Sequence, residues 1–214
     1  MDFLPALPVL GAYVAAVLVI TFTSGPDMTL FLGKAVRQGR ASGMAAMLGA
    51  STGVLIHTAL VALGLSALLA ASATAFFVLK VVGAIYLLWL AVDAVRHGSA
   101  LNLDAAPAPS TERLFHTWLK GLAVNLLNPK IIMFFVTFLP QFVAADDPHG
   151  MQKLFFLGFF FVAVAAPICA AMIASASHLA HFLKSSPRVM RAIDWLFAGI
   201  FGAFAVRLLF ARAH

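Results

Sequence analysis

The stretch TFTSGPDMTLFL (residues 21–32) decides the fold, because a helix-breaking step interrupts an apolar run that then continues. The stretch AVNLLNPKIIMFF (residues 123–135) repeats this pattern. In each, the turn before an X-Pro pair cannot accept the proline without losing a hydrogen bond. An ionisable residue follows each proline directly: Asp27 in the first stretch and Lys130 in the second. Each stretch therefore predicts two half-helices rather than one continuous rod.

Both breaks have the chemistry of a helix start. Gly25 and Asn128 suit the N-cap position, and Pro26 and Pro129 suit the first helical position. The two prolines lie 103 positions apart, which is close to half of the 214-residue chain. Matching breaks in two halves of a chain predict an internal repeat with one half-helix start in each copy.

The composition is that of an integral membrane protein. Sixty-three per cent of the residues are apolar, 10% are charged, and the mean hydropathy is +1.00. A soluble domain is about 45–50% apolar and about 25% charged. The polar groups are too few to cover a surface in water, so a soluble globular fold is excluded, and so is disorder. Cys169 is the only cysteine, which excludes a disulfide framework, a CxxC redox pair and a thiolate metal site.

Six apolar runs are long enough, or nearly so, to cross about 30 Å of hydrocarbon as helices of about 20 residues. None alternates with the two-residue period of a barrel strand, so the expected fold class is an all-α membrane protein. The first run has no basic region before it and no clear cleavage site, which predicts a retained helix. The predicted transmembrane helices are residues 6–24, 44–69, 74–95, 118–142, 154–178 and 192–210.

The lysine and arginine residues predict the orientation. Nine of them flank one set of connections and four flank the other, with Lys130 left out because it lies inside a predicted span. Cytoplasmic loops are rich in Lys and Arg, so the basic connections are expected in the cytoplasm and both termini outside. The net charge of +6 therefore reflects topology and does not indicate nucleic acid. The two sets are Lys34, Arg37, Arg40, Arg96, Arg113, Lys120, Lys184, Arg188 and Arg191, against Lys80, Lys153, Arg207 and Arg212.

A linker-like stretch divides the chain. Residues 98–113 are rich in Ala, Pro, Asp and Ser, and three predicted spans lie on each side. With an odd number of spans, the second half starts from the opposite membrane face, so the repeats are expected to be inverted. We expect one membrane domain (1–214) of six transmembrane helices in two inverted three-helix repeats (1–97 and 114–214). The linker is expected to be cytoplasmic, and the first and fourth helices to be broken.

The two breaks form the predicted substrate site. The first amides of each half-helix lack intrahelical partners and carry roughly half a positive charge, which suits a carboxylate. Asp27 could hold an ammonium group or a proton, and Lys130 could balance it or add to the carboxylate site. A zwitterionic amino acid fits this arrangement better than a sugar or a bare metal ion. The predicted substrate-binding residues are Ser24, Gly25, Pro26, Asp27, Asn125, Asn128, Pro129 and Lys130.

Structural alternatives stay open for these residues. Gly-Pro and Asn-Pro pairs in membrane helices are often only kinks, repaired by neighbouring side chains or waters. Asp27 also suits the first turn of a helix, and Lys130 could extend to a membrane interface. Intramembrane charges cost at least about 2.5–3.5 kcal/mol at mid-helix on insertion scales, which favours a functional role.

Three groups of short motifs stand out along residues 10–143. They are Gly25-Pro26-Asp27 with Gly39-Arg40, Gly43, Gly49, Gly53 and His57; KVVGAIYL (80–87); and Gly121 with NLLNPK (125–130) and PQF (140–142). Together they resemble the LysE/RhtB family of amino-acid exporters. Two positions depart from the family pattern: Ser24 stands where a proline is common, and Ala91 where a glycine is common.

The resemblance implies export of amino acids or close derivatives from the bacterial cytoplasm, in exchange for protons, by a multi-pass protein of the inner membrane. We expect a secondary transporter that works by alternating access, without a cofactor, a metal or enzymatic activity. No GxSxG, HExxH, Walker or GxGxxG string occurs in a usable context. The expected partners are a small amino-acid substrate and membrane lipid. A bundle this small is compatible with a homo-oligomer, which the sequence does not show.

The candidates for coupling export to an ion are Asp27, His57 and Lys80. Alternatives stay open for two of them. A hydrogen-bonded interior position suits His57, and an interfacial anchor suits Lys80.

Three rival functions also stay open. A divalent-cation exporter of a related fold would need several oxygen ligands, and the spans offer only Asp27, Asp93 and Asp194. A membrane redox factor would need a cysteine pair, and Cys169 is alone. A membrane assembly factor that transports nothing is the third interpretation.

Overall fold

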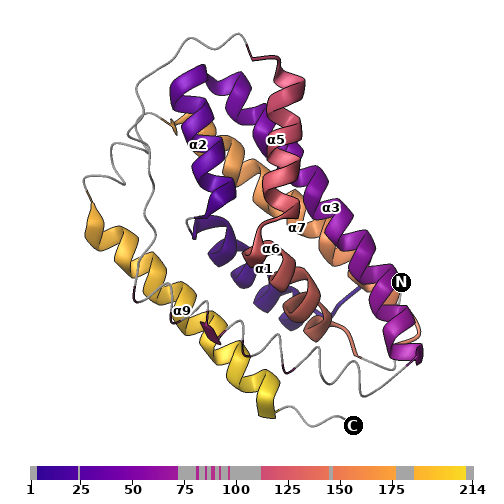
Figure 1. Ribbon diagram of the computed structural model, residues 1–214. Helices are drawn as coiled ribbons and strands as arrows, with labels where there is room; N and C mark the ends of the chain where they lie inside the picture. Colours follow the sequence, from indigo (N-terminus) through magenta and orange to yellow (C-terminus); the bar gives the residue numbers. More distant parts are fainter. Residues whose placement is uncertain are drawn as a thin grey trace.

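The computed structural model shows a bundle of helices, and no strand occurs in the part of the chain that it describes. Figure 1 shows the helices packed side by side, with α9 (Pro187–Phe210) along one flank. The predicted all-α fold class is confirmed. The described residues are 4–23, 25–71, 112–144, 147–176 and 186–210, with Val81, Ile85, Leu88, Trp89, Val92 and Arg96.

The first span is broken at the predicted place. Helix α1 (Leu7–Phe22) ends before Thr23, and α2 (Pro26–Gln38) begins at its proline with Gly25 as the N-cap. The two helices are bent by 54°. The bend leaves the last carbonyl groups of α1 without the amides that a continuous helix would supply.

The second break repeats this arrangement. Helix α5 (Leu114–Leu126) is followed by α6 (Pro129–Met133), and the pair is bent by 53° when the turns up to Phe142 are included. Asn128 is the N-cap of α6, because its Oδ1 accepts the backbone N–H of Lys130 at 3.0 Å. Both helix starts that the sequence predicted are therefore present.

The chain after α6 is less regular than the predicted span. Residues Phe134–Phe138 form a π-helical segment, and Leu139–Phe142 form a 3-10 turn. Pro140 has no N–H to donate, so it interrupts the regular hydrogen-bond ladder. The side chain of Gln141 compensates in part, since its Nε2 donates to the Thr137 carbonyl at 2.9 Å.

Two unbroken helices, α3 (Arg40–Ala71) and α7 (Gly150–Ala174), are long and apolar enough to cross a membrane. Each bent pair also qualifies when its helices are taken as one span, which gives up to four crossings in the described residues. Gly39, with φ +89°, allows the turn from α2 into α3. Most of the predicted span 74–95 and most of the linker 98–113 lie outside the described residues. The predicted span 192–210 lies within α9.

A close contact joins α3 to α5. A Cβ atom at Gly49 would lie 1.9 Å from the Trp118 carbonyl oxygen, and one at Gly121 would lie 2.0 Å from the Ala46 carbonyl oxygen. Only glycine permits backbones to approach this closely. The contact fixes the broken second span against the unbroken α3, and this determines where its break lies.

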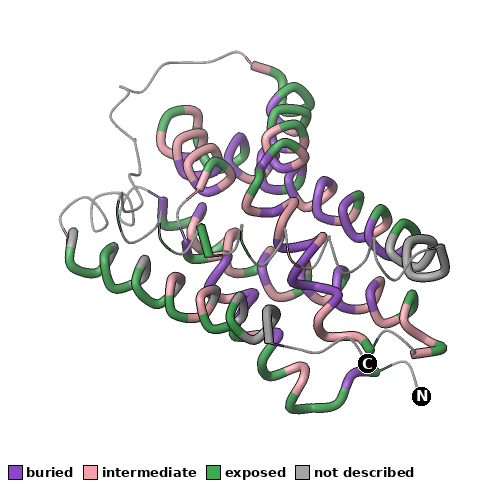
Figure 2. The backbone as a smooth tube through the Cα atoms, turned by 60° about the horizontal axis from the view of Figure 1, so that its bottom comes forward, coloured by how far each residue is buried: buried purple, intermediate pink, exposed green. Residues whose placement is uncertain are grey.

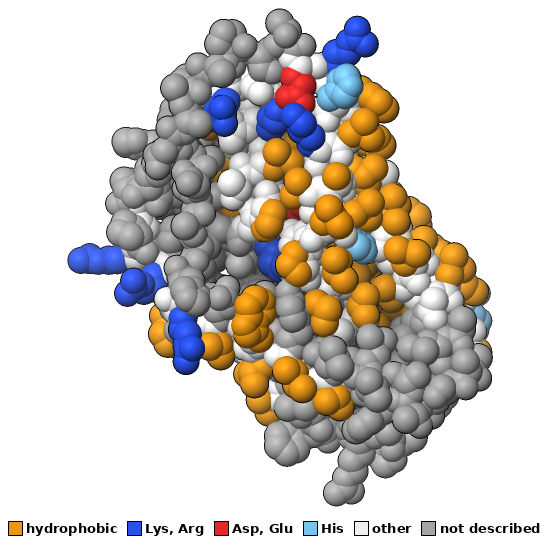
Figure 3. Space-filling model, viewed as in Figure 1, with side chains coloured by type: hydrophobic (Ala, Val, Ile, Leu, Met, Phe, Trp, Pro, Cys, Tyr) orange, Lys and Arg blue, Asp and Glu red, His pale blue; other side chains and the backbone are white. Residues whose placement is uncertain are grey.

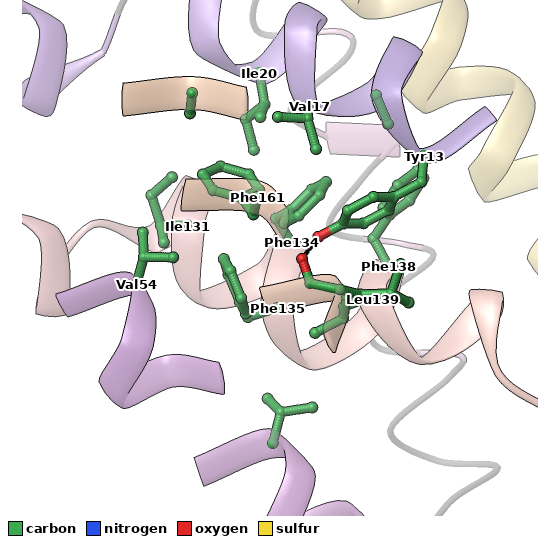
Figure 4. Packing of buried hydrophobic residues seen from close by; sticks show 14 of the residues in the cluster. Tyr13, Val17, Ile20, Val54, Ile131, Phe134, Phe135, Phe138, Leu139 and Phe161 are labelled. Carbon is green, nitrogen blue, oxygen red and sulfur yellow. Dashed lines mark hydrogen bonds between the residues drawn. The ribbon is translucent and has the colours of Figure 1, made fainter. Parts of the chain in front are cut away.

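An aromatic core fills the bundle on the side of α1 and α6. Tyr13, Phe134, Phe135 and Phe138 are fully buried, and their rings face one another between α1 and α7 (Figure 4). The Tyr13 hydroxyl donates to the Leu157 carbonyl at 3.0 Å, which satisfies the polar end of the ring. This side of the bundle is therefore densely packed.

The outward faces of the helices are also apolar. Figure 2 shows buried residues where the helices meet and exposed residues on the outside. The exposed side chains include Leu60, Leu63, Phe159 and Trp195. An apolar exterior of this kind suits a hydrocarbon solvent rather than water.

Candidate functional site: two broken helices meet at a carboxylate

The two breaks lie next to each other in the middle of the bundle (Figure 1). Oδ2 of Asp27 accepts hydrogen bonds from Nδ2 of Asn125 at 2.9 Å and from Nδ2 of Asn128 at 3.1 Å. A carboxylate can only accept, so both amides must present their nitrogen to it, and this fixes their orientation. One break therefore supplies the charge, and the other supplies the donors that hold it.

Lys130 reaches from the second break back to the first. Its Nζ donates to the Thr23 carbonyl at 2.9 Å and to the Ile20 carbonyl at 3.4 Å. A cation there satisfies carbonyl groups that the bend leaves without amides, and it complements the negative end of the α1 dipole. Gly25 leaves room for this side chain, because a Cβ at that position would lie 2.9 Å from Nζ.

A cavity of about 80 Å³ opens beside Asp27. Asn125 and Lys130 lie at the same end, and the remaining walls from α2, α3 and α7 are mostly apolar. A water molecule needs about 10–15 Å³ by the same measure, so the space suits several waters or one small molecule. The apolar walls include Met28, Phe31, Met47, Cys169, Met172 and Ile173.

Two buried oxygen atoms on the residues of this cavity lack a hydrogen-bond partner among the described residues. They are Oδ1 of Asp27 and Oδ1 of Asn125. Asn125 is only 2% exposed and lies against α3, where a Cβ on Gly53 would be 2.5 Å from Oδ1. A buried acceptor without a donor costs about 1–3 kcal/mol, so each oxygen is a position for a donor from a ligand or from water.

His57 lies behind the site rather than in it. Its Nε2 is 3.4 Å from the Asn125 carbonyl oxygen, and its ring stacks on Phe135 with the centroids 6.0 Å apart. The side chain is buried, and it is not among the residues that line the cavity. His57 therefore supports the end of α5, and its role in coupling stays a prediction.

A larger hollow of about 530 Å³ lies between α2 and α5, at the end of the bundle away from the aromatic core. There Glu112 pairs with Lys120 at 2.7 Å and with Lys34 at 2.6 Å. The hydrogen bonds from Lys120 and Lys34 lower the pKa of Glu112 to about 2. Figure 3 shows basic and acidic side chains gathered at this upper end, with hydrophobic side chains over much of the described surface below.

The family model for the LysE type translocator matches residues 18–212, which is most of the chain. The chain belongs to the LysE type translocator family. The resemblance seen in the motifs is confirmed, and the protein is a multi-pass protein of the bacterial cytoplasmic membrane.

Several curated relatives cover almost the whole chain. A homoserine/homoserine lactone efflux protein of Salmonella typhimurium is 31% identical over 202 residues, which are 94% of this chain and 96% of the relative. A threonine efflux protein of Escherichia coli is 28% identical over 197 residues, 91% of this chain and 94% of the relative. An uncharacterized membrane protein of Vibrio cholerae is 31% identical over 202 residues, 94% and 97% of the two chains. No solved structure matches.

In this LysE type translocator, most of the predicted substrate-binding residues come together. Gly25 and Pro26 start α2, Asn128 and Pro129 start α6, and Asp27, Asn125 and Lys130 line the cavity. Two of the predicted residues, Ser24 in the binding set and Lys80 among the coupling candidates, lie outside the described residues.

Other contributors to the translocator site were not predicted as such. The Ile20 and Thr23 carbonyls carry no side-chain signal, and the break itself was the only sequence clue to them. Gly53 belongs to one of the motifs that carry the family resemblance, but its contact with Asn125 depends on the α3–α5 approach. Met47 and Met172 resemble any other apolar residue of a span, so the sequence does not mark them.

Proposed function

We propose that this protein is a secondary transporter that exports small amino acids or close derivatives from the cytoplasm by alternating access, in exchange for protons. The observation that carries the proposal is the Asp27 carboxylate, which is held between two broken spans beside a cavity and whose Oδ1 is buried without a hydrogen-bond partner among the described residues. The named relatives export homoserine, homoserine lactone and threonine. Each of these molecules is small and has an α-ammonium group. The small size suits the volume of the cavity, and the ammonium group suits the Asp27 carboxylate. In this proposal the chain is a transporter and has no enzymatic activity.

Asp27 is the proposed ligand for the substrate ammonium or, when substrate is absent, for a proton. Asn125 and Asn128 hold Oδ2, which leaves Oδ1 for the cargo. Since one oxygen accepts either an ammonium or a proton at a time, release of one permits binding of the other. This competition would couple export of substrate to entry of protons.

The proposed transport cycle uses the difference between the two sides of the bundle. The cavity extends along α2 and α3, on the side of Lys34 and Lys120, whereas the aromatic core closes the side of α1 and α6. If the basic ends face the cytoplasm, as the Lys and Arg count predicts, the cavity faces inward in this state. The opposite state would open the aromatic core and close the cavity. The similar bends of 54° and 53° agree with an inverted repeat of three helices each.

Export of a divalent cation is the rival proposal. Among the described residues, no group of three or more His, Cys, Asp or Glu side chains could hold a metal ion. A divalent cation needs several oxygen ligands, so this observation favours an ammonium-bearing cargo.

Counterflow into proteoliposomes tests the function. Purified protein is reconstituted with an excess of unlabelled threonine or homoserine inside, and uptake of the labelled amino acid is followed with and without a proton gradient. The proposal predicts counterflow that a proton gradient accelerates and a protonophore suppresses, with none in liposomes that lack the protein. Flux of a divalent cation without flux of either amino acid would favour the rival, and no flux of any kind would favour an assembly factor.

A further inference from the structure

The hollow between α2 and α5 lies on a different face of α2 from the cavity beside Asp27, and the two spaces share no described lining residue. One face of α2 is buried against α3 and α7, and it carries Met28, Phe31, Leu32 and Ala35. The other face lines the hollow with residues at the three- and four-residue spacing of a helix face, Pro26, Thr29, Leu30, Gly33, Lys34 and Arg37. The hollow is therefore separate from the proposed cargo site.

The wall of the hollow changes from apolar to basic along the two helices. Leu30 of α2 and Val124 of α5 form its apolar part, on the side of the two breaks. Lys34 and Arg37 of α2 and Lys120 of α5 form its basic part, nearer the end of the bundle. A phospholipid has the matching order of groups, because its apolar acyl chains lead to a charged headgroup at the membrane surface.

Three cations face one carboxylate in the described lining of the hollow. Glu112 pairs with Lys34 at 2.6 Å and with Lys120 at 2.7 Å. Lys34 also donates to Oε1 of Gln38 at 3.0 Å. The side chain of Arg37 has no hydrogen-bond or ion-pair partner among the described residues. The described lining therefore has a net positive charge, and the uncompensated cation is the one at the end of α2.

The guanidinium of Arg37 has five N–H donors in a flat fork, and pairs of these donors match the oxygens of a phosphate. Its position in the last turn of α2 also complements the negative end of the helix dipole, but this interaction uses none of the donors. The side chain of Lys120 is 58% exposed and has N–H groups beyond the one that it needs for Glu112. An anion in the hollow would therefore find donors on both helices.

We propose that the hollow binds an anionic phospholipid, whose phosphate accepts from Arg37 and the two lysines while an acyl chain lies along Leu30 and Val124. The volume of about 530 Å³ falls within the usual range of about 300–1,000 Å³ for ligand pockets. Basic pockets between transmembrane helices suit such headgroups. Free phosphate has the same charged group, but it has nothing to place against the apolar part. The bound lipid connects α2 to α5, and so it joins the two broken spans near the membrane surface.

Native mass spectrometry of the full chain in a nonionic detergent tests this inference. The protein is titrated with dioleoyl phosphatidylglycerol, which is anionic, and with dioleoyl phosphatidylcholine, which has the same acyl chains and a phosphate but no net charge. Since the hollow has a net positive charge, the Kd of phosphatidylglycerol is expected to be lower by about tenfold or more. Equal Kd values for the two lipids would overturn the inference.

Arg37→Gln removes the uncompensated charge. Arg37 is exposed and has no partner among the described residues, so the fold is expected to persist. The Kd of phosphatidylglycerol is expected to rise by about tenfold, and that of phosphatidylcholine by less than about threefold. Lys120→Gln, which changes another exposed cation of the hollow, is expected to act in the same direction and serves as the second variant if Arg37→Gln does not fold.

Arg191→Gln is the matched control. Arg191 is also exposed, but it belongs to α9 and is not among the described residues that line the hollow. Its substitution removes the same charge and should leave the Kd of phosphatidylglycerol within about threefold of wild type. Equal losses of binding in Arg37→Gln and Arg191→Gln would mean that the lipid is attracted by the charge of the whole surface, and would overturn the inference.

Competition with inorganic phosphate separates the two sources of the anion. Phosphate in large excess is expected to displace no more phosphatidylglycerol than sodium chloride of the same ionic strength, because phosphate cannot replace the apolar contacts of the acyl chain. Displacement by phosphate beyond that of the chloride control would make the hollow a site for a soluble anion and would overturn its assignment to a lipid. No transport is measured in these experiments, so their outcome is independent of the proposed export.

Discussion

The two breaks bend by nearly the same angle, 54° and 53°, but their charged residues end in different situations. Lys130 of the second break donates to two carbonyl groups of α1, and its backbone N–H is capped by Asn128. Asp27 of the first break has one oxygen held by Asn125 and Asn128, and the other has no partner among the described residues.

The same motif therefore places one charged residue, Lys130, in a structural role and the other, Asp27, in a functional role. A charge whose hydrogen-bonding groups are engaged stabilises the fold, whereas a buried oxygen without a donor is available for a ligand. We therefore expect substitutions at Lys130 to affect mainly stability and substitutions at Asp27 to affect mainly transport.

The largest expected effect is that of Asp27→Asn. The asparagine oxygen can still accept from Asn125 and Asn128, so the fold is expected to persist. The charge that holds an ammonium or a proton is gone, and hydrogen bonds to charged groups contribute about 1.5–3 kcal/mol, so counterflow falls by about 10–100-fold or more. The acceleration by a proton gradient disappears as well, and counterflow in proteoliposomes measures both.

Asp147→Asn is the matched control for this variant. Asp147 pairs with Lys153 and accepts the backbone N–H of His149, away from the cavity. Counterflow is expected to stay near the wild-type level. Equal losses in the two variants would mean that Asp27 has no special role.

In contrast to Asp27→Asn, the variant Lys130→Met is expected to lower stability more than it affects transport. Methionine fills similar space but donates nothing, so the Thr23 and Ile20 carbonyls lose their partner. Each buried carbonyl left without a donor costs about 1–3 kcal/mol, which lowers the free energy of unfolding measured by denaturant titration in detergent. Lys153→Met, which removes a more exposed ion pair, should change this free energy much less. A stable Lys130→Met protein that has lost only transport would reverse the roles that we give to the two charges.

The sequence predicted both breaks because proline, glycine and asparagine act through local backbone rules. Pro26 and Pro129 start helices wherever the rest of the chain lies, and Asn128 caps α6 with an atom two residues from its partner. The hydrogen bond from Asn125 to Asp27 joins residues 98 positions apart and depends on the α3–α5 packing, so no local rule reveals it. No sequence pattern indicates the partners of Lys130, since backbone carbonyls have no side-chain identity. It also did not predict the π-helical segment Phe134–Phe138.

An intermediate effect is expected where α3 supports the second break. In Gly53→Ala, the new Cβ would lie 2.5 Å from Asn125 Oδ1, and the side chain that orients Asp27 must move. Overpacking of this kind costs about 1–3 kcal/mol, so counterflow is expected to fall by about tenfold. Gly64→Ala on the same helix is the control, because a Cβ there meets nothing within 4 Å. Similar transport by the two alanine variants would show that Asn125 is not needed to hold Asp27.

The smallest effect is expected for Glu112→Gln. The folded-state pKa of about 2 lies below the ordinary value of 4.5, so the pairing with Lys120 and Lys34 stabilises the protein above about pH 4.5. That stabilisation is lost as the pH falls towards 2. The pH profile of counterflow between about pH 5 and 8 should therefore be the same in Glu112→Gln and wild type. A different pH profile of counterflow in this range would mean that Glu112, at the end of the bundle, takes part in coupling transport to protons.

The contact between the breaks can be measured directly by solid-state NMR on protein in lipid, labelled with ¹⁵N in asparagine side chains and ¹³C in aspartate carboxyl groups. The structure predicts that two asparagine amides correlate with one carboxyl carbon at roughly 4 Å, and that both correlations disappear in Asp27→Asn. Asparagine amides that show no aspartate neighbour within that distance would contradict the meeting of the two breaks, and with it the site.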